Sequence, residues 1–196
     1  MDKTTRQEVR SAATRRVLLD ATISCLVEHG YGGTTGPAVA AKAGLSRGAQ
    51  LHHFGTRDQM VVAAVEHLAQ KRLESVRSQL EAMIPEDGST SPSRRALRLL
   101  ADALSGPLYA ATLELWVAAR ANAELRQQLV PAESRVHEEL EEICRRYVTE
   151  DAVAIQLTLE LLLGQGVSGM FDHERAQQSR RALDRWEQLL SERATS

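Results

Sequence analysis

Residues 34–57 read TTGPAVAAKAGLSRGAQLHHFGTR and contain the signals for two short helices joined by a tight turn. Thr35 is a good N-cap, and Pro37 fits the first turn of the helix that follows. Gly44 ends this helix, and Ser46 caps a second one over about residues 47–53. The stretch predicts a helix-turn-helix, in which the second helix presents its side chains to the major groove of DNA.

An ordinary helical hairpin inside a core is the alternative interpretation of the same stretch. The second helix, however, carries Arg47, Gln50, His52 and His53, which are polar side chains with few apolar neighbours. A hairpin buried in a core has no need for such groups. The pattern therefore favours a DNA-reading helix.

The rest of the chain also has helical patterning. Aromatic residues make up only 4% and proline is scarce, so leucine, alanine and valine must fill the core of an all-α protein. Apolar spacing and capping signals predict further helices over about 14–29, 57–84, 93–105, 107–121, 123–147, 150–170 and 174–193. The helix over 123–147 is expected to bend or break at Pro131.

The charges are unevenly distributed along the chain. Residues 1–58 contain eight Lys/Arg and five Asp/Glu, a balance of +3, and the net charge of −2 leaves −5 for the remainder. A basic front half suits contact with DNA at one end only. Residues 1–13 are expected to form a mobile polar arm, and Arg6, Arg10, Arg15 and Arg16 would add phosphate contacts.

Several other classes of protein are disfavoured. Cys25 and Cys144 do not make a disulfide framework, which fits a reducing cytoplasm. No apolar segment typical of a signal peptide is found, and the most apolar segment, 152–171, carries Gln156 and Glu160. We therefore expect a cytoplasmic protein without a membrane span.

Gly164-Gln-Gly166-Val-Ser-Gly169 matches the G-x-G-x-x-G pattern of dinucleotide-binding folds. Such a fold needs a strand, a helix and a returning strand, but only 27 residues follow, and they have a helical pattern. A dinucleotide-binding enzyme is thus the weaker alternative, and close packing of helices is the favoured reason for the glycines. His137, Glu141 and Cys144 share a helix face, yet we expect neither a metal nor a cofactor.

The chain resembles the TetR family of bacterial transcriptional regulators over about residues 14–68. The resemblance rests on residues spread over the predicted helix-turn-helix and its flanks: Gly30-Tyr31, Thr34-Thr35, Val39-Ala40, Ala43 to Gly48, His52 to Phe54 and Arg57. A second, weaker resemblance covers Glu114 to Arg120. The resemblance to the TetR family implies an N-terminal three-helix DNA-binding domain, residues 1–58, and a helical effector-binding and dimerisation domain, residues 59–196.

The resemblance also implies which residues contact DNA. These are Thr35, Arg47, Gly48, Ala49, Gln50, His52, His53 and Arg57. Two positions depart from the family. Leu51 stands where a tyrosine is frequent, so a phosphate contact is expected to be missing. Gln50 stands where an apolar residue is frequent, and it either reads a base or is buried with a structural role.

The same resemblance implies a non-enzymatic, homodimeric repressor that binds a pseudo-palindromic double-stranded operator and is released by a small-molecule effector. A transcriptional activator of the same fold remains an alternative. Tyr109 and Trp116 are candidates for the effector pocket, although both also suit a core. The last two helices are expected to form half of a four-helix dimer interface, with these apolar candidates: Leu159, Leu163, Val167, Leu183, Trp186 and Leu190.

Overall fold

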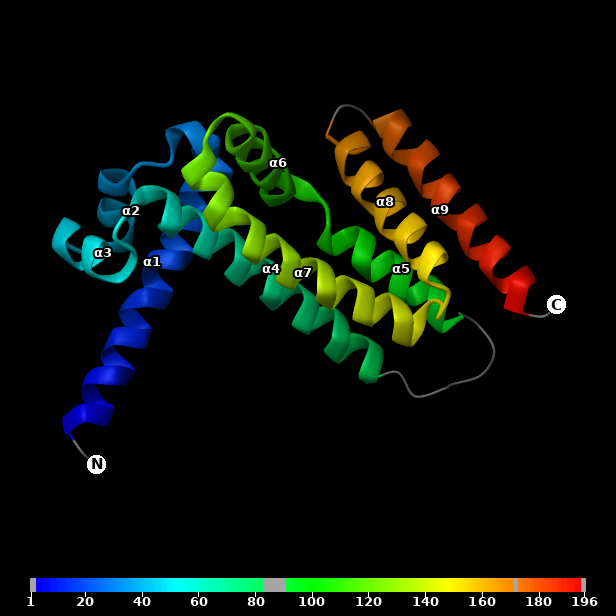
Figure 1. Ribbon diagram of the computed structural model, residues 1–196, viewed down its shortest axis with the longest axis horizontal. Helices are drawn as coiled ribbons and strands as arrows, with labels where there is room; N and C mark the ends of the chain where they lie inside the picture. Colours follow the sequence, from blue (N-terminus) through cyan, green and yellow to red (C-terminus); the bar gives the residue numbers. More distant parts are fainter. Residues whose placement is uncertain (1–2, 83–90, 171–172, 195–196) are drawn as a thin grey trace. The chain divides into compact units, whose positions relative to one another are not determined.

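The structure is a computed structural model that describes residues 3–82, 91–170 and 173–194. These residues form helices and no strands, which confirms the prediction of an all-α protein (Figure 1). None of the described helices is long and apolar enough to cross a membrane. The helices, in chain order, are α1 Lys3–Gly33, α2 Gly36–Ala43, α3 Arg47–Phe54, α4 Arg57–Glu81, α5 Pro92–Ala103, α6 Gly106–Ala121, α7 Ala123–Tyr147, α8 Ala152–Ser168 and α9 His173–Ala194.

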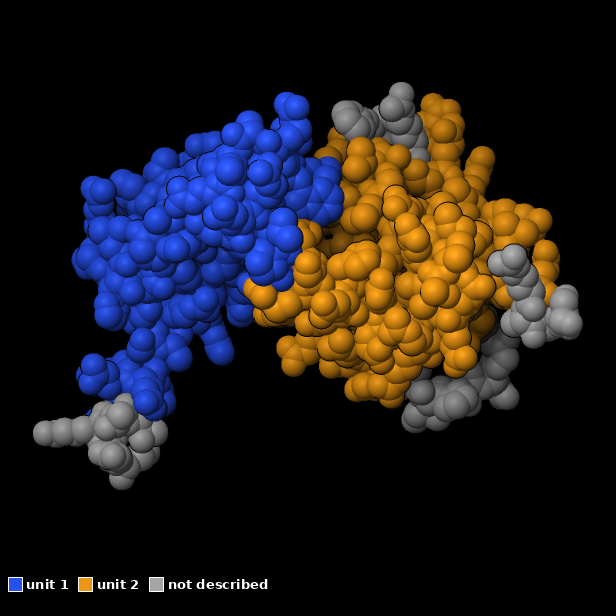
Figure 2. Space-filling model, viewed as in Figure 1, with its two compact units in different colours: residues 1–68, 111–132 blue, residues 69–110, 133–196 orange. Residues whose placement is uncertain are grey.

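The chain folds into two compact units (Figure 2). Unit 1 contains residues 1–68 and 111–132, and unit 2 contains residues 69–110 and 133–196. Helices α4, α6 and α7 each contribute residues to both units. The compact units do not correspond to the expected functional domains, because unit 1 also includes parts of α6 and α7. The functional division between residues 58 and 59 therefore stays a prediction.

One prediction about a helix end is wrong. Residues 3–13 belong to α1, which begins at Lys3, so the expected arm is helical rather than irregular. Helix formers dominate this segment, and neither Gly nor Pro interrupts it before Gly30. Helix α7 runs from Ala123 to Tyr147 with Pro131 inside it, so the helix does not break at Pro131, and the expected bend there stays a prediction. The predicted end of the fourth helix, near residue 84, lies outside the described residues.

Unit 1 has a core that joins α1 to the predicted helix-turn-helix. Buried apolar residues of α1, α2, α3 and α4 pack together there: Leu18, Leu19, Ala21, Cys25, Val39, Phe54, Met60 and Ala64. Gly30 has φ 66° and breaks the helical path of α1 just before Thr34 and α2. The break confirms that the first helix stops at Gly30 and lets the chain turn into α2.

Unit 2 has its own core around α5, α7, α8 and α9. Its fully buried members include Leu97, Leu100, Ile143 and Leu162. Burying four such side chains stabilises the unit by about 1.5–3 kcal/mol each. Helices α8 and α9 lie side by side (Figure 1).

Candidate nucleic-acid interface and cavity

The turn between α2 and α3 is built by short-range hydrogen bonds. Thr35 Oγ1 accepts from the Ala38 N–H at 3.3 Å, and Ser46 Oγ accepts from the Ala49 N–H at 3.2 Å. Gly44 has φ 64°, and the Leu45 N–H donates to the Ala40 carbonyl at 3.0 Å. The predicted caps and turn are therefore confirmed, and they aim the first turn of α3 away from the core.

Helix α3 has one exposed face and one buried face. Arg47, Gly48, Leu51 and His52 are exposed, and the one-turn spacing places them on the same side. Phe54 is buried in the core of unit 1. The described first turn of α3 carries no acidic side chain, so nothing there repels a phosphate.

Gln50 belongs to the buried face, with only 3% of its surface exposed. Its Oε1 lies against Gly36 in the first turn of α2, where an added Cβ would come within 2.9 Å of it. Reading a base would require this side chain to leave its site. Of the two interpretations, base reading and a buried structural role, the structure thus favours the second, in which Gln50 fills the space left by Gly36.

One basic side chain of α1, that of Arg15, approaches α3. The Arg15 guanidinium lies 5.1 Å from the centre of the Phe54 ring, and Arg6, Arg10 and Arg16 are exposed. Partial burial lowers the pKa of His53, and the positive charges of His52 and Arg15 lower it further. Neutral imidazole is therefore favoured at His53, which suits hydrogen bonding better than ionic attraction.

Arg57, predicted to contact DNA, bonds to groups of its own chain in the structure. Its Nε donates to the Thr34 carbonyl at 2.6 Å, and its Nη2 donates to the Tyr31 carbonyl. Its Nη1 pairs with Asp58 at 3.1 Å, and the guanidinium lies 4.2 Å from the centre of the Tyr31 ring. The guanidinium therefore holds the connection between α1 and α2 instead of pointing to solvent as a phosphate contact.

Glu114 of α6 completes this arrangement within unit 1. Its Oε2 accepts the Tyr31 N–H at 2.6 Å, and the Tyr31 hydroxyl donates to Asp58 at 3.0 Å. We call Tyr31, Thr34, Arg57, Asp58 and Glu114 the Arg57 cluster. The sequence pattern did not reveal this cluster because its partners, apart from the adjacent Arg57 and Asp58, are 23 to 83 residues apart.

Replacing Arg57 by alanine is expected to lower the free energy of unfolding by about 2 kcal/mol, since two carbonyls lose a charged donor. The value lies low in the usual range because the Arg57 side chain is 31% exposed. Urea denaturation of the free protein measures it, with Arg57→Lys as an intermediate case. An unchanged denaturation curve together with weaker DNA binding would instead restore the predicted phosphate contact.

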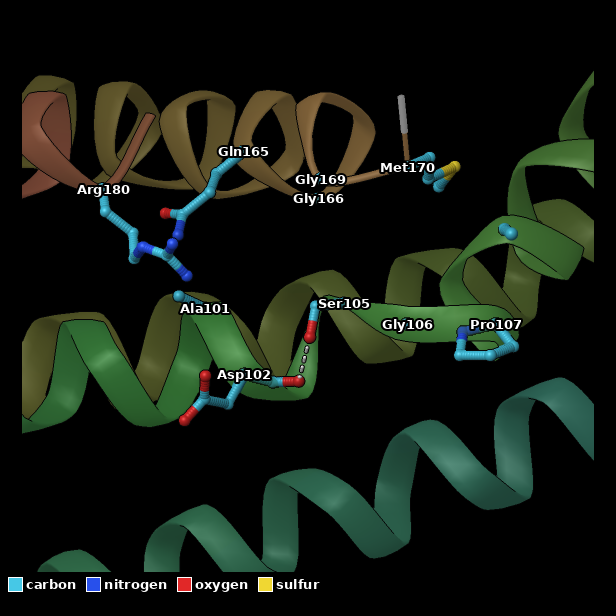
Figure 3. A pocket seen from close by; sticks show the side chains of 11 residues that line it. Ala101, Asp102, Ser105, Gly106, Pro107, Gln165, Gly166, Gly169, Met170 and Arg180 are labelled. Atoms are coloured by element: carbon cyan, nitrogen blue, oxygen red, sulfur yellow. Dashed lines mark hydrogen bonds between the residues drawn. The ribbon is translucent and has the colours of Figure 1, made fainter. Parts of the chain in front are cut away.

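Unit 2 contains a cavity of about 460 Å³ between the end of α5, the start of α6, and α8 and α9 (Figure 3). Gln165 of α8 and Arg180 of α9 point toward each other over Ala101 of α5. The Gln165 Oε1 atom is buried and has no hydrogen-bond partner among the residues that the structure describes. Pro107 and Met170 add apolar surface, so the cavity offers both polar and apolar contacts to a small molecule.

The two aromatic residues predicted for an effector pocket do not line this cavity. Tyr109 is buried beside Gly166, and its hydroxyl donates to the Leu163 carbonyl at 2.9 Å. Trp116 packs against the apolar core of unit 1. Nothing in the sequence pattern distinguished either residue from an ordinary core aromatic.

The apolar residues predicted for the dimer interface divide into two groups. Leu159 and Leu183 are buried in the core of unit 2 within one chain, and Leu190 is 9% exposed, so these three do not offer a surface to a partner. Leu163 and Val167 are half-buried. Trp186 is also half-buried, and its Nε1 donates to Thr158 Oγ1 at 2.8 Å.

Other apolar side chains of α8 and α9 face solvent. Val153 is 66% exposed, Leu157, one turn further along α8, is 49% exposed, and Leu189 of α9 is 38% exposed. The nearly continuous apolar sequence of α8 concealed this difference, because it does not indicate which side of the helix faces the core.

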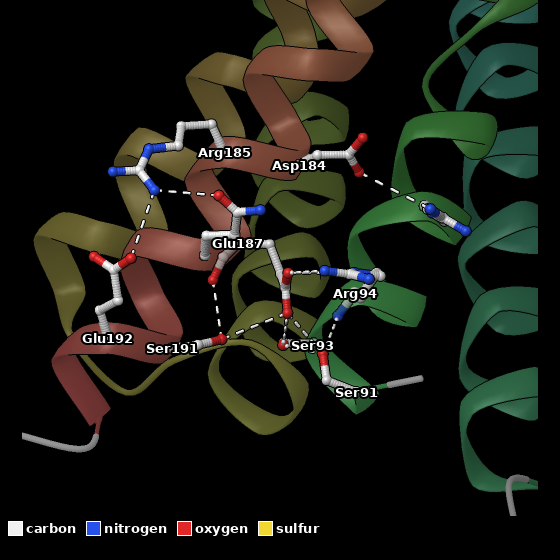
Figure 4. Close-up of polar contacts among 10 residues, drawn as sticks. Ser91, Ser93, Arg94, Asp184, Arg185, Glu187, Ser191 and Glu192 are labelled. Atoms are coloured by element: carbon white, nitrogen blue, oxygen red, sulfur yellow. Dashed lines mark hydrogen bonds and ion pairs between the residues drawn. The ribbon is translucent and has the colours of Figure 1, made fainter. Parts of the chain in front are cut away.

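Glu187 of α9 is the centre of a polar network at the start of α5 (Figure 4). One of its carboxylate oxygens accepts from Ser91 at 2.8 Å, and the other accepts from Arg94 at 2.9 Å. Burial by itself raises the pKa of Glu187, but the hydrogen bonds from Ser91 and Arg94 outweigh it, so the pKa lies below its ordinary value. The network ties α9 to the N-terminus of α5.

The glycine motif and the histidine–cysteine face have structural explanations. Gly164, Gly166 and the residues before them lie on helix α8, and no strand is found in the described residues, so the dinucleotide-binding alternative is wrong. His137 pairs with Glu141, whereas Cys144 is buried. Burial raises the pKa of the Cys144 thiol to about 12, which keeps it protonated at neutral pH.

Known proteins resemble this chain in sequence and in fold. The model of the family "Bacterial regulatory proteins, tetR family" matches residues 18–64. The HTH-type transcriptional regulator CymR of Pseudomonas putida is 31% identical over 165 residues, which cover 83% of this chain and 71% of CymR. The uncharacterized HTH-type transcriptional regulator Mb2936c of Mycobacterium bovis is 34% identical over 123 residues, or 63% of this chain.

That match covers 62% of the mycobacterial protein, so the chain spans about three fifths of the length of this relative. Among solved structures, the multidrug binding protein EbrR complexed with imidazole superimposes with a TM-score of 0.65 at 22% identity. The superposition covers 88% of this chain and 93% of EbrR. At this identity the likeness concerns the fold.

Proposed function

Because this chain belongs to the TetR family of bacterial regulatory proteins, we propose that it is a DNA-binding transcriptional regulator and not an enzyme. The observation that carries the proposal is the exposed face of α3, with Arg47 and His52 held outward by the Ser46 cap. This face suits the major groove, where arginine and histidine donate to base edges and phosphates. The exposed arginines of α1 supply further positive charge.

The proposed DNA contacts follow the exposure of each side chain. Arg47, Gly48 and His52 would meet base edges, Thr35 is exposed at the N-cap of α2, and Ala49 and His53 are half-buried at the margin of the surface. Gln50 and Arg57 mainly stabilise the fold around the helix-turn-helix, as described above. A short helix of this kind reads only a few base pairs, so one copy alone gives little specificity.

A homodimer would double the number of bases read. Val153, Leu157 and Leu189 offer exposed apolar surface on α8 and α9, and the proposed interface is centred there. A two-fold dimer requires a pseudo-palindromic operator with half-sites about 34–36 Å apart or a multiple of this distance. Such a protein would act on the chromosome in the cytoplasm.

The cavity of unit 2 is the proposed effector site, and repression relieved by the effector is the proposed mode of regulation. Its volume of about 460 Å³ suits a small molecule. We expect the effector to bind more tightly to a dimer conformation in which the distance between the two α3 helices does not match the half-sites. Such an effector would shift the population away from operator binding. EbrR, which has the same fold, binds imidazole. A transcriptional activator would have the same surfaces, and a reporter assay separates the two.

Footprinting on DNA that flanks the gene tests the proposal. We expect a protected pseudo-palindrome, and we expect Arg47→Ala to weaken binding there by about 1–3 kcal/mol, because a bidentate base contact is lost. Arg145→Ala is the matched control, since it removes the same charge from an exposed position on α7 in unit 2. Absence of any protected site, or equal losses for both variants, would contradict the proposal.

A further inference from the structure

We propose that Leu51 is a specificity-determining residue that contacts the 5-methyl group of a thymine, and that Gly48 provides the close approach this contact needs. The inference rests on the proposed DNA-binding function. It concerns a position where the family resemblance predicted only a missing phosphate contact. The structure places Leu51 on the exposed face of α3, beside Arg47, Gly48 and His52.

The exposure of Leu51 is not explained by the fold. Its side chain is 46% exposed, although Gln50 and Phe54 on the same short helix are buried. An apolar side chain is therefore held in water on the polar face that the proposed function turns toward DNA. Leucine has no hydrogen-bonding group for a phosphate or for a polar base edge.

Gly48 is likewise not required by the fold. Gly44 and Gly55, which flank α3, have φ angles of 64° that demand glycine, whereas Gly48 has no positive φ. Apart from its chain neighbours and the backbone of its own helix, a Cβ added to Gly48 would meet only Ser46 Oγ among the described residues, at an ordinary contact distance of 3.7 Å. Since glycine is an unfavourable residue in a helix, a reason outside the folded chain is indicated. Glycine here lets a neighbouring molecule come close to the helix, one turn before Leu51.

The chemistry of the major groove identifies the group that fits. Thymine is the one base that presents a methyl group there; cytosine carries only a hydrogen at the same ring position, and adenine and guanine present hydrogen-bonding atoms. The surroundings of Leu51 are basic, with Arg47 and His52 on the same face, so a polyanion is a better occupant than an apolar protein surface. A thymine methyl group in DNA satisfies both conditions, because it is an apolar group carried by a polyanion.

Deoxyuridine substitution tests the contact, because it removes only the methyl group. The probe is the duplex that the wild-type protein selects from random DNA, with each thymine replaced in turn. We expect one thymine per half-site at which the replacement weakens wild-type binding about four-fold, the value for one buried methyl group. Leu51→Ala should bind the unmodified duplex less tightly and lose its sensitivity at that thymine alone.

Two controls keep the outcomes distinct. Leu51→Ala is expected to keep its urea denaturation midpoint because the residue is exposed, and Gly48→Ala is expected to fold normally but to bind the selected duplex less tightly. The inference is overturned if every thymine sensitivity persists in Leu51→Ala, or if Gly48→Ala binds as well as the wild type. Failure to select any duplex would instead show that the proposed function is wrong.

Discussion

Replacing Gly166 by alanine is expected to destabilise unit 2 by about 3 kcal/mol, toward the upper end of the range for overpacked sites. The new Cβ would lie 2.4 Å from the Leu104 carbonyl oxygen and 2.5 Å from Cε1 of Tyr109. Neither neighbour moves easily, because one is backbone and the Tyr109 hydroxyl is bonded to the Leu163 carbonyl. Urea denaturation at a fixed protein concentration measures the loss.

Gly164 supplies the matched control within the same glycine motif. Apart from its chain neighbours and the backbone of its own helix, a Cβ at this position would meet no described atom within 4 Å, so Gly164→Ala should raise stability by up to about 1 kcal/mol through helix propensity alone. Opposite signs for the two variants would show that one glycine of the pair is there for close packing. Equal effects would refute this explanation of the motif.

Glu187→Gln is expected to cost about 2 kcal/mol of unfolding free energy at neutral pH. Glu187 is 4% exposed, and the substitution leaves its donors, Ser91 and Arg94, facing an amide that also carries protons. Hydrogen bonds to a charged group contribute about 1.5–3 kcal/mol, and the 40% exposure of the Arg94 side chain places the effect below the upper end. Asp184→Asn is the control, because its pair with Arg98 is exposed on both sides (Figure 4).

The same network predicts a direction for the pH dependence. Since the pKa of Glu187 is lowered in the folded protein, its contribution to stability is complete above the unfolded value of about 4.3. The contribution is lost as the pH falls through the folded pKa. The difference in stability between the wild type and Glu187→Gln should therefore be constant from pH 7 to about pH 5 and should shrink below about pH 4. A difference that grows on acidification would contradict the assigned role of this carboxylate.

The helix-turn-helix formed by α2 and α3 could be predicted in detail because the sequence signals for it are local. The caps at Thr35 and Ser46 and the turn at Gly44 each depend on residues no more than four positions away. The Thr56–Gln59 capping box at the start of α4 is equally local, with Thr56 Oγ1 accepting from the Gln59 N–H at 3.1 Å. Such interactions need no information about distant parts of the chain.

The roles of Arg57, Leu159 and Leu183 could not be predicted in this way, because the sequence around each residue is compatible with two different roles. An arginine after a capping threonine looks the same whether it points to a phosphate or, as here, to carbonyls near residue 31. A leucine on an apolar helix likewise looks the same in a core and at an interface, yet Leu159 and Leu183 are buried within one chain.

Local sequence therefore established the presence of the helices, the caps and turn of α2 and α3 and the outward face of α3, because backbone hydrogen bonding and capping act over a single turn. The partners of Arg57 and Glu187, the buried side of α8 and the burial of Gln50 depend on segments brought together by folding. Their energies come from side chains that are far apart along the chain, and only the packed arrangement of helices brings those groups into contact.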